Sequence, residues 1–568
     1  MMHHPRAVQR PRRPWLGAVL LSVGFGVADP SASAQSPGTV AYDIQITSGR
    51  GGFTGALDAG ESFGSAVTAI GDFDGNGVTD IVVGAQYDDD GGSLKGALWV
   101  LFLDIDSSVA SFQKISAASG GFGTEPGALG LGAALACLGD LDGDGVTDIA
   151  AGTPSATVGT VSSSGGVWIL FMKPDGTVRS LQPIGAATGG FGGALDLQDH
   201  FGSALAPLGD IDGDGVMDLA VGADQDDDGA FNSGALWILF LNRDGTVKSQ
   251  QKVSETQGGF GGGIEANDYF GGSVAALDDL DGDGVPELAV GAFSGGGFGT
   301  GVVWVLFLAA DGTVKSQHEI GTLEVPDLVV GDYFGRGVTA IGDLDGDGRR
   351  ELAVGASRDD ETGFGDYGCV RILFLDDSGE VTGLQKISQF EGGFGGTLGS
   401  QAGFGWSLAD PGDLDGDGAT DLVVGAPGGA SNPLTDGEAW LLFLVHGPWT
   451  WLDHALGGSL GTPSLIGSGA PLAGEPVTLD LAHAAPSSIT TLVIGTDTLF
   501  APLKGGVLVP LPVALAPAVT DTGGALSLSA TWPSGLPPGL TIYLQHWIVD
   551  ATAPQGFAVS NAVSATTP

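Results

Sequence analysis

Short apolar runs alternate along the chain with turns rich in Gly and Asp, and the alternation recurs at a regular interval. In the clearest copy, apolar runs occupy about residues 201–209, 219–223, 234–241 and 247–253. Runs of this length, bounded by Gly and Asp, are typical of β-strands, and four in succession fit one blade of a β-propeller. The third run is apolar at successive positions, which predicts a strand covered on both faces.

An acidic loop of nine residues lies between the first and second runs of each copy. Successive loops begin 64 to 70 residues apart, at Asp72, Asp140, Asp210, Asp279, Asp343 and Asp413. Self-similarity at a nearly constant period indicates one supersecondary unit repeated in space. The sequence therefore predicts an all-β fold with six four-stranded blades.

The two ends of the repeat array complement each other. Residues 38–53 superimpose without a gap on residues 245–260, the outer strand and following loop of the third copy, before any first blade has begun. The sixth copy stops after its third run at about residue 444 and lacks an outer strand. We expect residues of about 39–47 to supply that strand and to close a six-bladed ring, so that neither end of the array needs a capping repeat.

Composition changes after Trp451. Residues 455–568 lack the acidic loop and carry apolar segments between Gly and Pro turns, which favours a small β-sandwich-like domain of unknown role. We assign residues 35–448 to the propeller and residues 449–454 to a linker.

Residues 1–34 resemble a secretory signal peptide. Arg6, Arg10, Arg12 and Arg13 precede an apolar run at residues 15–27, and Ala32 and Ala34 form a small-residue cleavage motif. We expect a secreted, periplasmic or cell-surface protein, with no membrane span in the mature chain because no later stretch reaches about 20 apolar residues.

Charge narrows the possible partners. The chain of 568 residues has a formal net charge of −47, so nucleic acid is excluded as a natural partner, because phosphate binding needs a basic surface. Its two cysteines, Cys137 and Cys369, fall at non-equivalent positions of two repeats, and we expect two buried, unpaired thiols.

The acidic loop follows the pattern Asp-x-Asp-Gly-Asp/Asn-Gly-x-x-Asp/Glu. Oxygen side chains at positions 1, 3, 5 and 9, with the carbonyl of position 7, suit Ca²⁺, which accepts six to eight oxygen ligands. An EF-hand does not fit, because its acidic twelfth position is Val or Ala here and no helix follows. Like-charged carboxylates without metal repel one another, so we expect about six structural Ca²⁺ ions.

The predicted ligands, blade by blade, are Asp72, Asp74, Asn76, Val78 and Asp80; Asp140, Asp142, Asp144, Val146 and Asp148; Asp210, Asp212, Asp214, Val216 and Asp218; Asp279, Asp281, Asp283, Val285 and Glu287; Asp343, Asp345, Asp347, Arg349 and Glu351; and Asp413, Asp415, Asp417, Ala419 and Asp421.

The repeat resembles the FG-GAP repeat of integrin alpha-chain propellers and their bacterial relatives. Phe-Gly precedes the first loop Asp by nine residues in five copies, Leu131-Gly132 takes its place in the second, and Gly-Ala-Pro occurs at residues 425–427. The resemblance implies a calcium-bearing propeller used for adhesion or ligand binding. Integrin propellers have seven blades, whereas six are counted here, and Arg371 replaces the Trp of the other third strands.

The face opposite the acidic loops is where the blades differ. Its second turns carry acidic clusters at residues 88–90, 226–228 and 359–361, which are either solvated turns or a site for a cation or for a cationic or hydroxyl-rich ligand. A Gly-Gly-Phe motif before five blades is more typical of a packed plug between blades than of a sugar platform.

Two functions remain open. The first is a binding or adhesion module for a protein or glycan ligand on a calcium-stabilised propeller. The alternative is a polysaccharide-active enzyme that uses acidic residues of the opposite face, such as Asp226 and Asp359, although no catalytic motif is found.

Overall fold

The computed structural model describes residues 37–567, with gaps at 125–128, 361–364, 417, 429–435, 446, 448, 453–455, 460–462, 469–472, 475, 483, 505, 535 and 538–539. The predicted signal peptide lies outside the described residues. The chain divides into two compact units, a larger one of residues 36–344 and 349–446 and a smaller one that includes residues 447–568.

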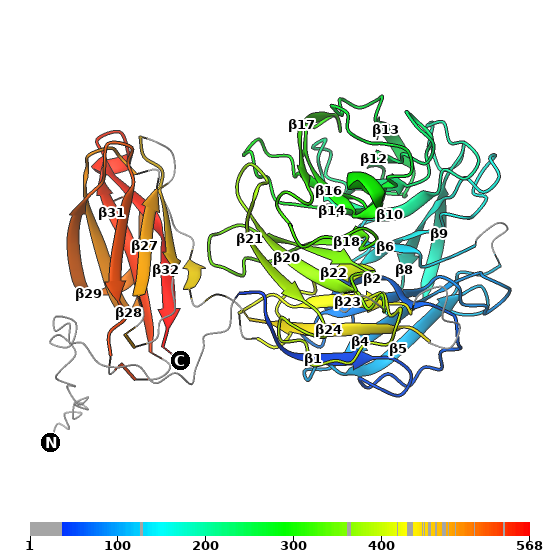
Figure 1. Cartoon of the computed structure of the whole chain (residues 1–568), viewed down its shortest axis with the longest axis horizontal. Coiled ribbons are helices and arrows are strands. Elements are labelled where there is room, and N and C mark those ends of the chain that lie inside the picture. Colours follow the sequence, from blue (N-terminus) through cyan, green and yellow to red (C-terminus); the bar gives the residue numbers. More distant parts are fainter. Residues whose placement is uncertain are drawn as a thin grey trace, which may run out of the picture. The chain divides into compact units, whose positions relative to one another are not determined.

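The larger unit is a ring of six four-stranded antiparallel sheets, which confirms the predicted propeller (Figure 1). Blade one contains β2 (Phe63–Gly71), β3 (Asp80–Ala85), β4 (Ala97–Leu103) and β5 (Val109–Ser116). Blade two contains β6 (Ala134–Gly139), β7 (Asp148–Gly152), β8 (Val167–Met172) and β9 (Val178–Ile184). Blade three contains β10 (Phe201–Gly209), β11 (Asp218–Ala223), β12 (Ala235–Leu241) and β13 (Val247–Val253).

The remaining blades follow the same order. Blade four contains β14 (Phe270–Ala276), β15 (Leu288–Ala292), β16 (Val302–Leu308) and β17 (Val314–Ile320), with a five-residue π-helix, η1 (Gly295–Gly299), in its second turn. Blade five contains β18 (Phe334–Ile341), β19 (Glu351–Ala356), β20 (Cys369–Leu375) and β21 (Val381–Ile387). Blade six contains β22 (Ser407–Ala409), β23 (Leu422–Ala426) and β24 (Glu438–Leu444).

The fourth strand of blade six comes from the other end of the repeat array. β1 (Val40–Ile46) pairs antiparallel with β24, placing Ile44 opposite Leu441 and Ile46 opposite Ala439. In Figure 1 the blue N-terminal strand lies beside the yellow β24. This pairing confirms the predicted closure and leaves β24 without a free edge.

The cores of the propeller lie between blades. The third strand is buried at every position in five blades, for instance in β4 and β12, because neighbouring sheets cover both of its faces. Six apolar clusters each join two adjacent blades around the ring. One of them unites Ile46 and Leu441 of blade six with Phe63 and Val83 of blade one.

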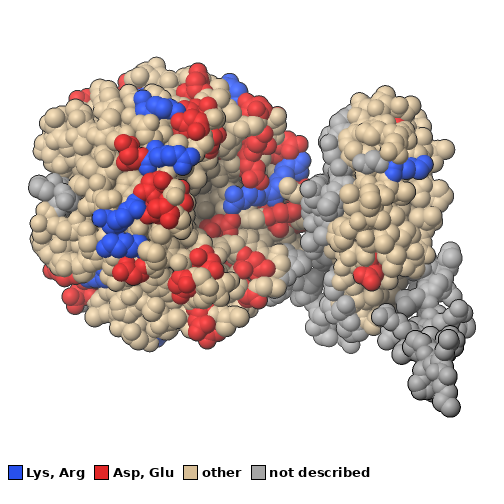
Figure 2. Space-filling model, turned by 180° about the vertical axis from the view of Figure 1, so that it is seen from behind, with Lys and Arg blue, Asp and Glu red and all other residues tan. Residues whose placement is uncertain are grey.

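Backbone contacts hold neighbouring blades close together. Gly234 has φ +90°, and a Cβ on it would lie 2.1 Å from the carbonyl oxygen of Phe270 in the next blade, so only glycine fits there. Serine hydroxyls on four inner strands donate to a glycine carbonyl of the following blade, as Ser65 does to Gly132 over 2.9 Å. The first strands therefore surround the axis closely, and Figure 2 shows a hollow at the centre of the ring.

The smaller unit consists of two sheets that share one core. A five-stranded sheet has the order β25 (Trp449–Leu452), β32 (Phe557–Thr566), β31 (Thr541–Val549), β28 (Ile489–Leu503) and β29 (Gly506–Val519). A three-stranded sheet contains β26 (Ser464–Ser468), β27 (Pro476–Ala482) and β30 (Leu526–Thr531), and a short 3-10 helix, η2 (Pro554–Gly556), precedes β32. Side chains of both sheets meet in one apolar cluster, as in a sandwich.

Two further observations concern the whole chain. Both cysteines are free, but Cys137 is only half-buried, whereas Cys369 is buried, so the expectation of two buried thiols holds for Cys369 alone. Among the described residues, no helix is long and apolar enough to cross a membrane.

Candidate metal centres in the acidic turns

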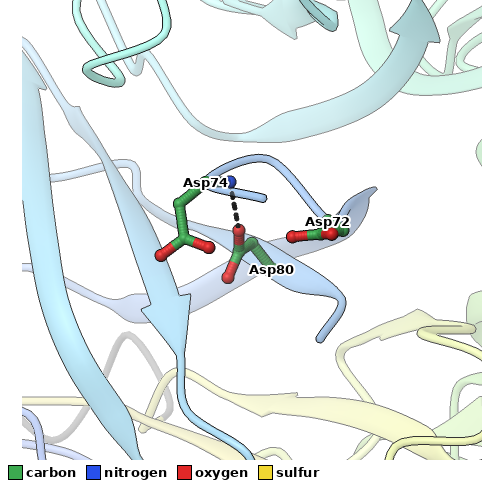
Figure 3. Close-up of side chains that lie close together, drawn as sticks. All are labelled: Asp72, Asp74 and Asp80. Carbon is green, nitrogen blue, oxygen red and sulfur yellow. Dashed lines mark hydrogen bonds between the residues drawn. The ribbon is translucent and has the colours of Figure 1, made fainter. Parts of the chain in front are cut away.

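The acidic loop of blade one forms the turn between β2 and β3. Carboxylate oxygens of Asp72, Asp74 and Asp80 lie within 4.8 Å of one another, and Figure 3 shows these side chains gathered around the turn. Asp72 and Asp74 are exposed, whereas Asp80 is buried at the start of β3. Residues separated by eight positions thus contribute oxygens to a single cluster.

Backbone N–H groups of the turn hold these carboxylates in place. The Gly77 N–H donates to Asp72 Oδ2 over 2.9 Å, and the Asp74 N–H donates to Asp80 Oδ2 over 3.2 Å. The first of these bonds needs a tight backbone, which Gly75 and Gly77 supply at φ +81° and +92°. The two glycines of the motif are therefore required by the turn itself.

The acidic residue at position 9 also supports the blade, a role that the sequence did not reveal. Asp80 Oδ1 accepts a hydrogen bond over 2.8 Å from the Leu103 N–H at the end of β4. Asp148, Asp218 and Asp421 accept the equivalent bonds from Met172, Leu241 and Leu444. Position 9 therefore ties the turn to the third strand as well as facing the cluster.

Burial makes these position-9 acids weak acids in the absence of a cation. Desolvation raises the pKa of Asp80, Asp148 and Asp218 to about 6, and that of Glu287 to about 7. Negative charge on neighbouring loop carboxylates contributes to each increase in pKa, and backbone hydrogen bonds to the carboxylates oppose it. Glu287 Oε1 is buried without a hydrogen-bond partner. Buried carboxylate oxygens that lie close to other carboxylates suit a divalent cation, which would stabilise their negative charge.

The same convergence recurs around the ring. Ligand atoms also lie within 4.8 Å in the groups Asp140, Asp142 and Asp148; Asp210, Asp212 and Asp218; Asp279, Asp281 and Glu287; and Asp343, Asp345 and Asp347. Asp413, Asp415 and Asp421 hold the matching positions in blade six, while Asp417 lies outside the described residues. Several acidic clusters can therefore bind metal.

Positions 5 and 7 are shaped by local contacts. Asn76 and Asp144 at position 5 each accept a hydrogen bond from the N–H of position 7, Val78 or Val146. The side chains of Val216, Val285 and Ala419 at position 7 pack toward the apolar clusters. Arg349, the remaining position-7 residue, ion-pairs with Asp377 over 2.7 Å. Only the backbone carbonyl of position 7 is thus available as the predicted ligand in most turns.

A basic residue on the outer strand accompanies three of the six turns. Lys315 Nζ lies 2.6 Å from Asp281 and 2.5 Å from Asp283, and Lys248 and Arg179 pair in the same way with the position-3 and position-5 acids of blades three and two. Blades one and six carry Ala110 and Ala41 at this strand position. Figure 2 shows Lys and Arg beside some acidic clusters of the propeller and not beside others.

The acidic clusters on the opposite face are mostly paired within their own blades. Asp88 is fully buried 2.7 Å from Lys114, Asp226 is buried 2.8 Å from Lys252, and Asp359 lies 3.2 Å from Lys386. Asp89 and Asp227 are exposed, and Glu361 lies outside the described residues. The carboxylates considered for a cationic ligand or for catalysis, Asp226 and Asp359, are therefore held in ion pairs.

The Gly-Gly-Phe aromatic is a plug between blades, as the sequence favoured. Phe53, Phe122, Phe191, Phe260 and Phe394 are all buried. Each meets the Trp of the following blade near a right angle, as Phe191 does with Trp237 at a ring-centroid distance of 5.0 Å and 74°. These rings are packed rather than presented to a ligand.

The fold and its turns define a class of protein, the six-bladed propeller with an acidic turn between the first two strands of each blade. Within this class, the chain contains FG-GAP repeats, matched at residues 63–101, 133–170, 201–239, 270–306 and 404–442. These segments cover the first two strands and most of the third strand of blades one to four and six. Blade five, in which Arg371 replaces Trp, lies outside the matched segments.

Integrin alpha chains are among the similar proteins. Integrin alpha pat-2 of Caenorhabditis briggsae is 33% identical over 237 residues, which are 40% of this chain and 18% of the relative. Integrin alpha-4 of Xenopus laevis is 32% identical over 161 residues, 28% of this chain and 14% of the relative. The chain thus spans less than a fifth of the length of these relatives.

One solved structure aligns over most of the chain at low similarity. The V. cholerae biofilm matrix protein Bap1 covers 94% of this chain and 71% of its own, with 13% sequence identity and a TM-score of 0.28. This similarity is too low to support an argument about fold or function.

Proposed function

We propose that this protein is a secreted or cell-surface binding and adhesion module whose propeller is stabilised by Ca²⁺ in its acidic turns. The observation that carries the proposal is the convergence of carboxylate oxygens within 4.8 Å in equivalent turns of successive blades. The FG-GAP repeats and the similarity to integrin alpha chains support a role in adhesion or ligand binding.

The chemistry of the turns favours Ca²⁺ over other common metals. All side-chain donors are oxygens, and burial raises the pKa of the position-9 acids, so a bound cation would stabilise their charged form. Mg²⁺ gives up its water reluctantly and demands octahedral geometry, whereas Ca²⁺ accepts irregular sets of oxygens. The residues that would hold the ions are those at positions 1, 3, 5 and 9 of each turn, together with the carbonyl at position 7. A bound ion would supply the charge that offsets carboxylate repulsion.

Calorimetry with and without metal tests the calcium proposal. Wild-type protein should melt at a markedly higher temperature in Ca²⁺ than in chelator, since an ion that binds only the folded state stabilises it. Titration should show about six sites. Asp212→Asn should reduce the Ca²⁺-dependent rise, whereas Asp227→Asn, which removes an exposed carboxylate from the opposite side of the same blade, should not. An unchanged melting temperature in chelator would reject a structural role for the metal.

A glycan and matrix-protein array, read with and without Ca²⁺, tests the binding role. The proposal expects retention of a ligand in Ca²⁺ and its loss in chelator, because removal of the ions loosens the blades that present the surface. Product analysis on every bound glycan provides the control. Turnover of a glycan that is lost in Asp226→Asn would contradict the proposal and establish the enzymatic alternative.

A further inference from the structure

An arginine and a tryptophan interrupt a ring of small residues around the propeller axis. The residue that directly follows the Phe-Gly pair (Leu-Gly in blade two) of each blade lines a cavity of about 80 Å³. In blade order these residues are Ser65, Ala133, Ser203, Gly272, Arg336 and Trp406. Arg336 lies near the start of β18, while the acidic turn follows the end of that strand. The two large side chains therefore belong to the face opposite the candidate metal centres.

Arg336 is the centre of a continuous set of aromatic and guanidinium groups. Its Cζ lies 3.9 Å from the ring centroid of Trp406 and 4.8 Å from that of Phe293. Phe293 stacks on Tyr269 at 5.1 Å and contacts Tyr333 at 5.7 Å. Arg358 Cζ lies 4.5 Å from the Tyr333 ring. We call these six residues, Tyr269, Phe293, Tyr333, Arg336, Arg358 and Trp406, the axial array.

Glycines next to the array create the space for it. A Cβ on Gly272 would lie 2.5 Å from Phe293 Cε1, so the ring can fold over this position only because no side chain is present. A Cβ on Gly337 would lie 2.8 Å from the carbonyl oxygen of Gly405, which keeps β18 and β22 close where Arg336 meets Trp406. The stacking thus depends on two small residues in the inner strands.

Among the described residues, the two arginines of the array contact aromatic rings and not carboxylates, in contrast to most basic residues of the propeller. At least nine described Lys and Arg side chains lie within 4.0 Å of a carboxylate. Within the described part of the chain, no carboxylate lies within 4.0 Å of the guanidinium group of Arg336 or Arg358. Both guanidinium groups lie over aromatic rings instead. The array is therefore a local cationic site on a strongly acidic protein.

Burial lowers the pKa of the Arg336 guanidinium. Desolvation lowers its pKa to about 10, while the charge of Asp224, itself 3.2 Å from His200, opposes this shift. The guanidinium remains charged at neutral pH but has lost much of its hydration. A partly desolvated cation gains free energy from an anionic partner, and the planar donor fork of arginine matches a carboxylate.

We propose that the axial array binds the carboxylate of an acidic sugar, a uronate, with Arg336 as the anchoring residue. This inference rests on the proposed function as a binding module and specifies its ligand class. The cavity of about 80 Å³ has room for a carboxylate next to Arg336. The sugar ring then lies outside the cavity, on the half-exposed faces of the aromatic residues, with Arg358 at the edge.

The composition of the array favours a uronate over an acidic peptide. A uronate carries an apolar C–H face and a carboxylate on one rigid ring, so both can meet the array at once. The array provides both groups that a uronate needs, because its aromatic rings can contact the C–H face and its guanidinium groups can bind the carboxylate. An extended peptide is usually held by backbone hydrogen bonds to an exposed sheet edge. The fourth strand ends the sheet of each blade, as β1 and β17 do, whereas Arg336 and Trp406 line the cavity between the inner strands.

Isothermal titration with a galacturonate trisaccharide tests the proposal, with the methyl-esterified trisaccharide as the uncharged comparison and both measured in excess Ca²⁺. Wild-type protein should bind the acid and not the ester. Arg336→Gln should weaken binding by about tenfold to a hundredfold, as expected for loss of a charged hydrogen-bonding group. Arg336→Lys should lose less, because it keeps the charge but not the fork. Arg243→Gln, which removes an exposed arginine near the acidic turns, is the matched control and should bind normally.

Equal binding of the acid and the ester, or full binding by Arg336→Gln, would overturn the proposal, since affinity would then come from another surface or from Ca²⁺ in the turns. Preference for a glutamate oligopeptide over the trisaccharide would also overturn it. Melting curves check that each variant folds, and Arg358→Gln, at an exposed position, supplies a second variant with an expected loss of about threefold to tenfold. If another ligand binds while uronates do not, only this inference fails. If chelator leaves the melting temperature unchanged, only the calcium proposal fails.

Discussion

Arg371 Nη2 donates a hydrogen bond to Asp359 Oδ2 over 2.9 Å inside blade five, at the strand position where the other blades carry Trp. The same guanidinium reaches Asp327 at 2.8 Å, in the segment that precedes the blade. In the other blades this segment supplies the Phe that packs on Trp. Blade five therefore lacks both the Phe and the Trp of this aromatic contact. The ion-paired Arg371 occupies the position of the Trp instead.

Replacing Arg371 should destabilise the propeller strongly. Arg371 is fully buried, and Arg371→Met leaves the buried Asp359 with Lys386 as its remaining ion-pair partner among the described residues. Removing one partner of a buried ion pair costs about 3–5 kcal/mol. We expect a clear fall in the unfolding midpoint in urea. Lys173→Met, at an exposed lysine, should change the midpoint little, and equal effects of the two variants would contradict the structural role of Arg371.

Truncating the Phe of a Gly-Gly-Phe motif should also lower the stability of the propeller. Phe191→Ala removes a buried ring from between blades two and three, and a buried Phe→Ala substitution costs about 3–5 kcal/mol. Phe231→Ala is the control in the same region of the chain, because that side chain is 65% exposed. Thermal melting should separate them by several degrees. If the control melted as low as Phe191→Ala, the ring would not be a packed plug.

The sequence predicted features that depend on residues close together in the chain better than contacts between residues far apart in the chain. The strands, the closure by β1 and the turn geometry follow from local patterns and from the repeat. The pairing of Lys114 with Asp88 did not follow, because the two residues are 26 positions apart on different strands of one blade. The sequence did contain a signal for these ion pairs. Each blade with an acidic cluster in its second turn also has a lysine on its outer strand, namely Lys114, Lys252 or Lys386.

The axial array was also missed, for a related reason. Arg336 and Trp406 are 70 positions apart and meet only because the inner strands converge on the axis. Each departs from the small residues at the matching position of the other repeats, such as Ser65 and Ser203. Deviations from a repeat, compared at one position across all copies, would have identified the array without a structure.

The basic residues beside three acidic turns should act as competitors of the metal. Lys248 contacts both Asp212 and Asp214. Lys248→Met removes a positive charge from the cluster, so it should lower the melting temperature in chelator and enlarge the rise produced by Ca²⁺. Lys252→Met, whose lysine pairs with Asp226 on the opposite face, should leave the Ca²⁺-dependent rise unchanged. A smaller rise in Lys248→Met would show that the lysine assists binding instead.

Glu61 should make stability depend on pH. Burial, together with the charge of Asp88, raises the pKa of Glu61 from 4.5 to about 7. The folded protein therefore holds this proton more tightly, and the free energy of unfolding falls as pH rises from about 4.5 to about 7. Glu61→Gln should remove this fall and stabilise the protein at pH above 7 by no more than about 3 kcal/mol. Asp89→Asn, at an exposed carboxylate of the same blade, should keep the wild-type slope. A slope that survives in Glu61→Gln must come from other groups.

Closure of the ring by β1 should control how cooperatively the propeller unfolds. Deletion of residues 35–48 would remove the fourth strand of blade six, leave the backbone of β24 unpaired and expose the apolar cluster that Ile46 shares with blade one. We expect a much lower melting temperature and a broader transition, because the ring would then have two free ends. Ile46→Ala, at a fully buried position, should cost about 2–5 kcal/mol while keeping one sharp transition. Ala41→Ser, at an exposed position of the same strand, is the control. An unchanged melting curve after the deletion would mean that the six blades hold together without the strand.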